Sequence, residues 1–382
     1  MNATNYLARE RELAEQLLPG LDKALSEVPL GDLEVRGGPG LDFFKTAGGP
    51  GLLAPHKCGG VGADPLDAVL VQRAVAARSP SLAVATMMHH LSVASFAEFL
   101  EANCPPEAPE WELLGMVAGA QMLVASASAE GKTKQSVLAP TLRARWDGEV
   151  WRVTGSKKPC SLAGSLDLLT ASVLLEGDHP AAGTVSMALV LAGTEGMSSR
   201  PFWKAQLLAG AESDEVVLTD VAVPDDLMVH SGVTPGTGMD EVQVRGWTWF
   251  ELLATASYLG VVSGLVERAL AAGAADQLGE VHVAVESGAL ALEAVARSLR
   301  EVSPRDALGR ALLVRFHVQD LVVATGAEVT AILGGLAFIQ DPDVSYLLGC
   351  TRALAFHPPS RRKAVPALAA FVAGDGFDTA VF

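Results

Sequence analysis

The chain has 382 residues, of which 49% are hydrophobic, with a mean hydropathy of +0.30 and a formal net charge of −16 at pH 7. This length is enough for two or three domains, or for one large multilayer unit, with a sizeable core. The acidic charge disfavours duplex nucleic acid as a partner, because binding to phosphates requires clustered lysine and arginine. It leaves room for an anionic cofactor, which needs only a few local cations.

The N-terminal segment MNATNYLARERELAEQLLPG lacks the apolar core of a signal peptide and has the spacing of an amphipathic helix. No uninterrupted apolar run is long enough to span a bilayer, so we expect a cytoplasmic protein without a membrane partner. The four cysteines form no Cys-x-x-Cys pair, which is typical of isolated thiols in a reducing compartment. The high apolar content favours further burial in a homodimer or homotetramer.

Residues 1–120 have a helical pattern. Asp64-Pro65 is a typical helix start and precedes apolar residues at helical spacing. A second helical run ends before Pro105-Pro106. We therefore expect an N-terminal helical domain over this range.

Residues 121–235 change to a strand pattern. The segment TLRARWDGEVWRVTGSKK alternates apolar and polar residues around Asp147-Gly148, which predicts a β-hairpin. The segments DLLTASVLL, TVSMALVLAG and DEVVLTDVAVP predict further strands. A β-domain is therefore expected here.

Residues 240–382 are helical again, after the Pro/Gly-rich linker HSGVTPGTGMDE. Long apolar runs such as FELLATASYLGVVSGLVERALAAGAA predict buried helices. The order of the three segments is thus helical, strand-rich and helical.

Four phrases in this order resemble the acyl-CoA dehydrogenase family, and together they cover essentially the whole chain: 51–85, 147–164, 213–229 and 333–356. The resemblance implies an α+β fold with an N-terminal helical domain, a middle β-barrel or β-sandwich domain and a C-terminal four-helix bundle. It also implies FAD as the cofactor, with FMN or a weakly held reduced flavin as alternatives.

The family's Thr-Glu-Pro-Gly-x-Gly-Ser stretch, which lies under the flavin ring and pyrophosphate, is matched here by ASAEGKTKQS. The match implies flavin contacts from Ser128 and Glu130, with Ala129 in place of the family's threonine. Lys132 and Lys134 replace small residues. They are expected either to pair with the pyrophosphate or to lie on a solvated turn.

A second flavin wall is matched by GSKKPCS, in which Pro159 replaces an aromatic residue. The Ser161 hydroxyl either reaches the edge of the flavin or only caps a strand end. The resemblance also implies a cofactor contact from Gly334 and Gly335, although the final glycine of that family turn is missing. The family's Arg-x-x-Phe-Gly phrase, which holds the adenine half of FAD, is not visible.

Two residues are candidates for the catalytic base. His357 falls where the family's C-terminal loop usually carries a glutamate, and Pro358-Pro359 follow it. A neutral imidazole can also accept a proton. Glu251 lies close to the position of the base that some family members carry on a helix, one residue past it if Gly260 is the landmark.

Substrate contacts are expected from His89 and His90, on the helix that borders the acyl pocket in this family, and from Arg361, which either binds a phosphate or lies on a solvated turn. Adjacent histidines on a helix point about 100° apart, so they cannot ligate one metal from one face. No other cluster has the spacing of metal ligands, and we expect no metal.

Three functions remain open from the sequence. The first is a flavin-dependent dehydrogenase that oxidises an acyl thioester of CoA or of a carrier protein. The second is a monooxygenase on the same fold, which needs oxygen and a flavin reductase or another electron-transfer partner, and whose substrate is another small molecule. The third is a flavin-free, non-catalytic homologue.

Overall fold

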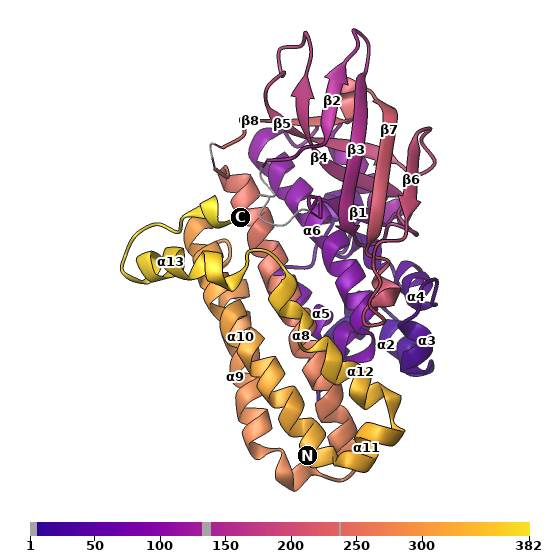
Figure 1. Ribbon diagram of the computed structural model, residues 1–382, viewed down its shortest axis with the longest axis vertical. Helices are drawn as coiled ribbons and strands as arrows, with labels where there is room; N and C mark the ends of the chain where they lie inside the picture. The colour runs from indigo at the N-terminus through magenta and orange to yellow at the C-terminus, as the bar shows by residue number, and fades with distance from the viewer. Residues whose placement is uncertain (1–5, 132–138, 237) are drawn as a thin grey trace.

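The computed structural model describes residues 6–131, 139–236 and 238–382. It places an eight-stranded sheet at one end of a long helical body, with the C-terminal helices on the side away from the sheet (Figure 1). Of the N-terminal helices, α6 (Pro80–Asn103) packs against both the sheet and the C-terminal helices. This arrangement brings segments from all three parts of the chain together where the sheet meets the helices.

Within residues 6–131, seven α-helices precede the sheet. Asp64 caps the fifth of them, because its side chain accepts a hydrogen bond from the backbone N–H of Asp67. This confirms the predicted helix start at Asp64-Pro65. The helices are α1 (Ala8–Leu17), α2 (Leu21–Ser26), α3 (Leu30–Leu33), α4 (Gly40–Thr46), α5 (Pro65–Arg78), α6 (Pro80–Asn103) and α7 (Trp111–Gly119).

The sheet has the strand order β6-β7-β3-β2-β4-β5-β8, and β1 pairs with β4. Its strands are β1 (Val124–Ala127), β2 (Arg143–Trp146), β3 (Trp151–Cys160), β4 (Leu168–Glu176), β5 (Val185–Leu191), β6 (Met197–Arg200), β7 (Asp214–Val223) and β8 (Met228–Val233). Antiparallel β2 and β3 confirm the predicted hairpin, and β4, β5 and β7 are the three further strands that were predicted.

The C-terminal helices surround one central helix, α8. A capping box begins α8, because the Asp240 side chain accepts from the backbone N–H of Gln243 and the Gln243 side chain accepts from the backbone N–H of Asp240. Since α8 is apolar on all sides, it is buried along most of its length. The helices are α8 (Glu241–Ala271), α9 (Gly279–Ser298), α10 (Pro304–Leu333), α11 (Gly335–Gln340), α12 (Pro342–Cys350) and α13 (Arg361–Val372).

Two of these helices, α8 and α10, have the length and composition that crossing a membrane would need. The most apolar window of α8 is completely buried inside the protein, and that of α10 is 44% buried. Such helices are common in protein cores, so this finding is weak evidence for a membrane segment.

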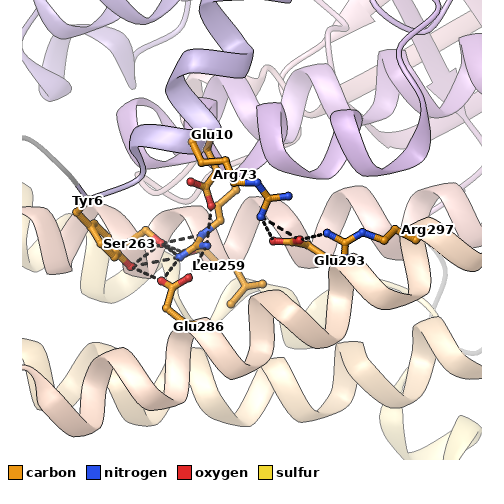
Figure 2. A network of polar contacts seen from close by, with 9 residues as sticks. Tyr6, Glu10, Arg73, Leu259, Ser263, Glu286, Glu293 and Arg297 are labelled. Carbon is orange, nitrogen blue, oxygen red and sulfur yellow. Dashed lines mark hydrogen bonds and ion pairs between the residues drawn. The ribbon is translucent and has the colours of Figure 1, made fainter.

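A buried polar network fastens the N-terminal helices to the C-terminal ones (Figure 2). Arg73 of α5 donates hydrogen bonds to Glu10 of α1 at 3.0 Å, to Glu286 of α9 at 2.6 Å and to Ser263 of α8 at 3.2 Å. Tyr6 also bonds to Arg73 and Glu286. Four helices from both ends of the chain therefore meet at one guanidinium group.

Candidate active site

One cavity of about 1000 Å³ lies where the sheet meets α6, α7, α8 and the loop after α12. The segments that resemble the two flavin walls of the acyl-CoA dehydrogenases both line it. Ser128 and Ala129 come from the first segment, and Pro159 and Ser161 come from the second. His357 lines the same cavity from the C-terminal loop. Three predicted features of the site, far apart in the sequence, thus share one space.

Strand register explains why hydroxyl groups face this cavity. Ser126 of β1 is the partner of Thr170 of β4, and Ser172 lies two residues further along β4. Because side chains on a strand alternate between the two faces of the sheet, all three point to the same face. Ser161 adds a fourth hydroxyl, 2.9 Å from that of Ser213. The sheet therefore presents a polar patch to an otherwise mainly apolar cavity.

His357 follows a short 3₁₀ turn, Ala353–Phe356, and its Nε2 atom lies 2.9 Å from the hydroxyl of Tyr258 on α8. Its ring meets Phe250 edge-on. Burial and the charge of Arg315 lower the pKa of His357 to about 3. The imidazole is therefore uncharged at neutral pH.

Glu251 does not line the cavity, although His357 does. Its carboxylate forms an ion pair with Arg315 of α10 at 3.0 Å, and both side chains are 0% exposed. Burial raises the pKa of Glu251 to about 7, while Arg315 opposes this rise. Neither member of the pair lines the cavity, so the geometry does not support Glu251 as a catalytic base.

Arg315 connects this ion pair to the loop that carries His357. Its guanidinium donates hydrogen bonds to the carbonyl oxygens of Leu354 at 3.2 Å, His357 at 2.5 Å and Pro358 at 2.9 Å. Arg315 was not among the residues expected from the sequence. Its contacts lie about 40 residues away along the chain, where no local motif could indicate them.

Glu130 is a structural neighbour of the cavity rather than part of its lining. It accepts hydrogen bonds from Lys157 Nζ at 2.8 Å, from the backbone N–H of Thr141 at 2.7 Å and from that of Leu142 at 3.2 Å. These contacts hold the segment that presents Ser128 to the cavity. Glu130 therefore positions this wall, and its expected direct contact with the cofactor stays a prediction.

Lys132 and Lys134 lie outside the described residues, so their predicted contact with a phosphate stays a prediction.

His89 and His90 are buried on α6 and do not line the cavity. Val124 N–H donates to His89 Nδ1 at 3.0 Å, and His89 Nε2 bonds to the carbonyl of Pro50 at 2.9 Å. His90 packs against Phe44. These contacts fasten α6 to β1 and to the turn at Pro50, so the geometry does not support the expected substrate contact.

The remaining candidates also lie away from the cavity. Gly334 and Gly335 connect α10 to α11, at the end of the helical body opposite the sheet (Figure 1). Arg361 forms an exposed ion pair with Asp320 at 2.6 Å. Within one chain, the structure does not bring these three residues to the cavity.

Tyr258 and Trp203 are among the aromatic lining residues that were not expected from the sequence. Trp203 donates its backbone N–H to Asp214 and its indole N–H to the carbonyl of Leu207 at 2.8 Å. Asp214 adjoins Ser213 in the sequence. Trp203 thus supplies an aromatic ring to the cavity in which Pro159 replaces the family's usual aromatic residue.

The charged side chains among the described lining residues are acidic. They are Asp240 and the exposed Glu241, at the start of α8. No lysine or arginine occurs among the lining residues within 6–131, 139–236 and 238–382. This part of the cavity therefore favours a neutral or cationic molecule over an anionic one.

Comparison with solved structures identifies the fold. KijD3, solved in complex with FMN and a dTDP-linked amino sugar, superposes with a TM-score of 0.83 over 96% of this chain and 94% of its own, at 18% identity. Butyryl-CoA dehydrogenase from Megasphaera elsdenii gives a TM-score of 0.76 over 97% and 98%, at 14% identity. The fold is that of the acyl-CoA dehydrogenases, as the sequence predicted.

No protein-family model matches the chain. Isobutylamine N-hydroxylase from Streptomyces viridifaciens is 41% identical over 367 residues, which are 95% of this chain and 97% of that enzyme. The chain belongs to the family of this enzyme. An oxidoreductase is therefore supported, and the monooxygenase alternative is better supported than acyl-thioester dehydrogenation.

Proposed function

We propose that the protein is a reduced-flavin-dependent monooxygenase that hydroxylates the nitrogen of a small aliphatic amine. The observation that carries this proposal is the uncharged His357, which lines the cavity from the loop where the acyl-CoA dehydrogenases usually carry a glutamate. Glu251, the other candidate base, is held by Arg315. Removal of a proton alpha to a thioester needs a base next to the flavin, and neither residue provides a carboxylate there.

The cavity residues fit a flavin. Ala129 and Pro159 offer small apolar surfaces, Ser128 and Ser161 offer hydroxyl groups, and Trp203 offers an aromatic ring. A planar ring system with polar edges matches this combination, and the cavity volume is at the upper end of the range for ligand sites, about 300–1,000 Å³. These residues would hold the ring.

The phosphate of the flavin needs a cation, which the described lining residues do not supply. Lys132 and Lys134 follow Ser128 closely in the sequence. We propose that they bind the phosphate.

When bound, reduced flavin supplies two electrons, so that one atom of O₂ enters an N–H bond of the amine and the other leaves as water. The balance is R–NH₂ + O₂ + reduced flavin → R–NHOH + H₂O + oxidised flavin. The protein's part is to hold the substrate in a largely apolar space, where water is excluded, and to control one proton near the reacting atoms.

The hydrogen bond between His357 and Tyr258 determines which atom carries that proton. Burial raises the pKa of Tyr258, so its hydroxyl stays protonated. Its hydroxyl forms a hydrogen bond with His357 Nε2 at 2.9 Å, in which either group can be the donor, and we propose that Tyr258 donates. The ring proton of the uncharged His357 therefore lies on Nδ1, the atom left to meet a ligand.

The amine is favoured as substrate by the charge of the cavity and by the relative. Asp240 and Glu241 would attract an ammonium group, and the apolar side chains of Met88, Leu91 and Phe96 on α6 would accept its hydrocarbon part. The phosphates of CoA would meet acidic residues here. The N-hydroxylase of Streptomyces viridifaciens acts, by its name, on isobutylamine.

The protein's partners are a flavin reductase and, we propose, further copies of itself. Leu336 and Ile339 on α11 are 72% and 77% exposed, as expected of a surface covered in a homo-oligomer. A cytoplasmic location stays a prediction.

The decisive experiment supplies reduced FMN from a separate reductase and offers a panel of primary amines under ¹⁸O₂. The expected product is a hydroxylamine that carries one ¹⁸O atom, detected by mass spectrometry. Reduction of oxidised flavin by an acyl thioester without oxygen, and no hydroxylamine from any amine, would contradict the proposal in favour of the dehydrogenase.

A further inference from the structure

We propose that Arg315 is a positioning residue, which holds the loop of His357 in place from behind the cavity, with Glu251 as its counter-ion. The inference uses the proposed function only for the role of His357. The contacts themselves do not depend on which reaction the cavity performs.

The loop needs an outside donor because of its own sequence. Pro358 and Pro359 have no backbone N–H, so they cannot donate hydrogen bonds that would stabilise a turn. The backbone N–H of His357 donates to the carbonyl of Leu354 at 3.3 Å, and the next backbone N–H along the chain that donates to a backbone carbonyl is that of Lys363. The carbonyls of Leu354, His357 and Pro358 instead accept hydrogen bonds from the Arg315 guanidinium.

The geometry of arginine suits this task. A guanidinium presents several N–H groups in a rigid plane, so one side chain fixes three carbonyls and a carboxylate at defined angles. Because His357 contributes one of those carbonyls, rotation of its backbone would break a 2.5 Å bond. Tyr258 then fixes the ring at Nε2. Backbone and ring are thus held from two different helices, α10 and α8.

Glu251 offsets the free-energy cost of burying the charged guanidinium of Arg315. A charge with no exposed surface is costly unless it is paired, and Glu251 faces Arg315 with both carboxylate oxygens at 3.0 and 3.2 Å. This accounts for an acid on an otherwise apolar helix without a catalytic role.

Burial keeps the imidazole of His357 neutral, and the charge of Arg315 adds to this effect. Arg315 is the cation beside His357, and with burial it lowers the pKa of the ring. The other groups that face the ring are Tyr258, which stays protonated, and Phe250, which is apolar. The acidic lining residues of the cavity are Asp240 and Glu241. Loss of Arg315 would therefore let the loop of His357 move and would make protonation of its imidazole easier.

The test uses two variants. In Glu251→Leu/Arg315→Met both charges are removed together, so that neither is left buried alone. In Arg315→Lys the charge stays but the planar donor group is lost. A matched control is Arg73→Met, which breaks an equally buried arginine network that does not touch the cavity (Figure 2).

The first readout is the NMR titration of the histidine rings without flavin, amine or oxygen, with the His357 signal assigned by its absence in His357→Gln. We expect no protonation of His357 down to pH 5 in the wild type and the Arg73→Met control. In the double variant, which lacks the neighbouring cation, the onset of its titration should appear at a higher pH than in the wild type. This result does not depend on hydroxylase activity, so it separates failure of this inference from failure of the proposed function.

The second readout is kcat for amine hydroxylation at saturating amine. Misplacement of a reacting group by about 1 Å costs about 100-fold, so we expect a fall of that size in the double variant and a smaller fall, with little change in KM, in Arg315→Lys. Folded variants with an unshifted His357 titration and an unchanged kcat would overturn the inference. If the double variant does not fold, an unchanged kcat in Arg315→Lys would overturn it alone.

Discussion

Two buried arginines of this protein are used in different ways. Arg73 bonds to side chains of three other helices and joins α1, α5, α8 and α9 (Figure 2). Arg315 bonds to one carboxylate and three backbone carbonyls of an irregular loop. An arginine that joins regular helices stabilises the fold, whereas one that binds loop carbonyls fixes a shape that the loop cannot hold by itself. A buried ion pair alone does not reveal which of the two it is.

The largest effect should come from the group that Arg315 positions. We expect His357→Gln to lower kcat for hydroxylation by about 100-fold or more, because a positioned proton donor or acceptor contributes that much. Glutamine can still bond to Tyr258, so the loop should stay in place. Stopped-flow kinetics with reduced FMN would measure the change. A variant with wild-type kcat would show that His357 is not in the reaction.

Loss of Arg73 should affect stability alone. In Arg73→Met, the unfolding free energy should fall by about 3 kcal/mol, the lower end for a broken buried ion pair. The lower end is expected because the Glu286 side chain is 41% exposed and can be solvated again. Urea denaturation measures this loss, and specific activity at 20 °C serves as the control. A fall in kcat without a fall in stability would show that Arg73 acts on the active site and does not only stabilise the fold.

The buried histidines far from the loop should make the protein sensitive to acid. Burial lowers the pKa of His89 to about 4 and that of His90 well below 6.5. The unfolded chain therefore binds more protons below pH 6.5 than the folded one, and stability falls as the pH falls. Each ring should contribute about 1.4 kcal/mol per pH unit below this point.

Urea denaturation at pH 6.5 and 5.5 tests this slope. His90→Leu removes one titrating ring, whose Nδ1 atom has no hydrogen-bond partner among the described residues. The variant should show a shallower pH dependence than the wild type. An identical slope in both proteins would be evidence against the neutral, buried ring.

The smallest effect concerns the cavity wall opposite the loop. Trp203→Leu should weaken flavin binding by about 2- to 10-fold, as expected for the loss of one aromatic contact, and Trp203→Phe should restore most of it. Titration of FMN by fluorescence, with reduced FMN titrated anaerobically, measures the affinity. Phe202→Leu is the matched control, because this neighbouring ring does not line the cavity. Equal affinity in all three variants would exclude Trp203 from the flavin site.

Much of the fold was predictable from local patterns. The cap at Asp64, the hairpin at Asp147 and the three further strands were all expected, since each depends on residues within one element. Three residues that were expected at the site, Ser128, Ser161 and His357, line the cavity, because motif phrases close to them in the sequence marked their positions.

Two expectations that the geometry does not support share one cause. Glu251 was a candidate base by its place relative to Gly260, and its partner Arg315, 64 residues away, lies beyond any such local pattern. His89 was taken as a substrate contact because the carbonyl of Pro50 and the N–H of Val124, which use both its nitrogens, are 39 and 35 residues away. A side chain's chemistry depends on its partners, and these partners are brought together only by folding.

By itself, the sequence determined the order of helices and strands, the likeness to the acyl-CoA dehydrogenases and the imidazole at the C-terminal loop. These follow from periodicity, turn chemistry and motif spacing, which act over short distances along the chain. Only the tertiary structure decided that His357 is uncharged and meets Tyr258, and that Glu251 serves Arg315. Hydrogen bonding, burial and charge pairing act through space, between residues that the sequence separates by tens of positions.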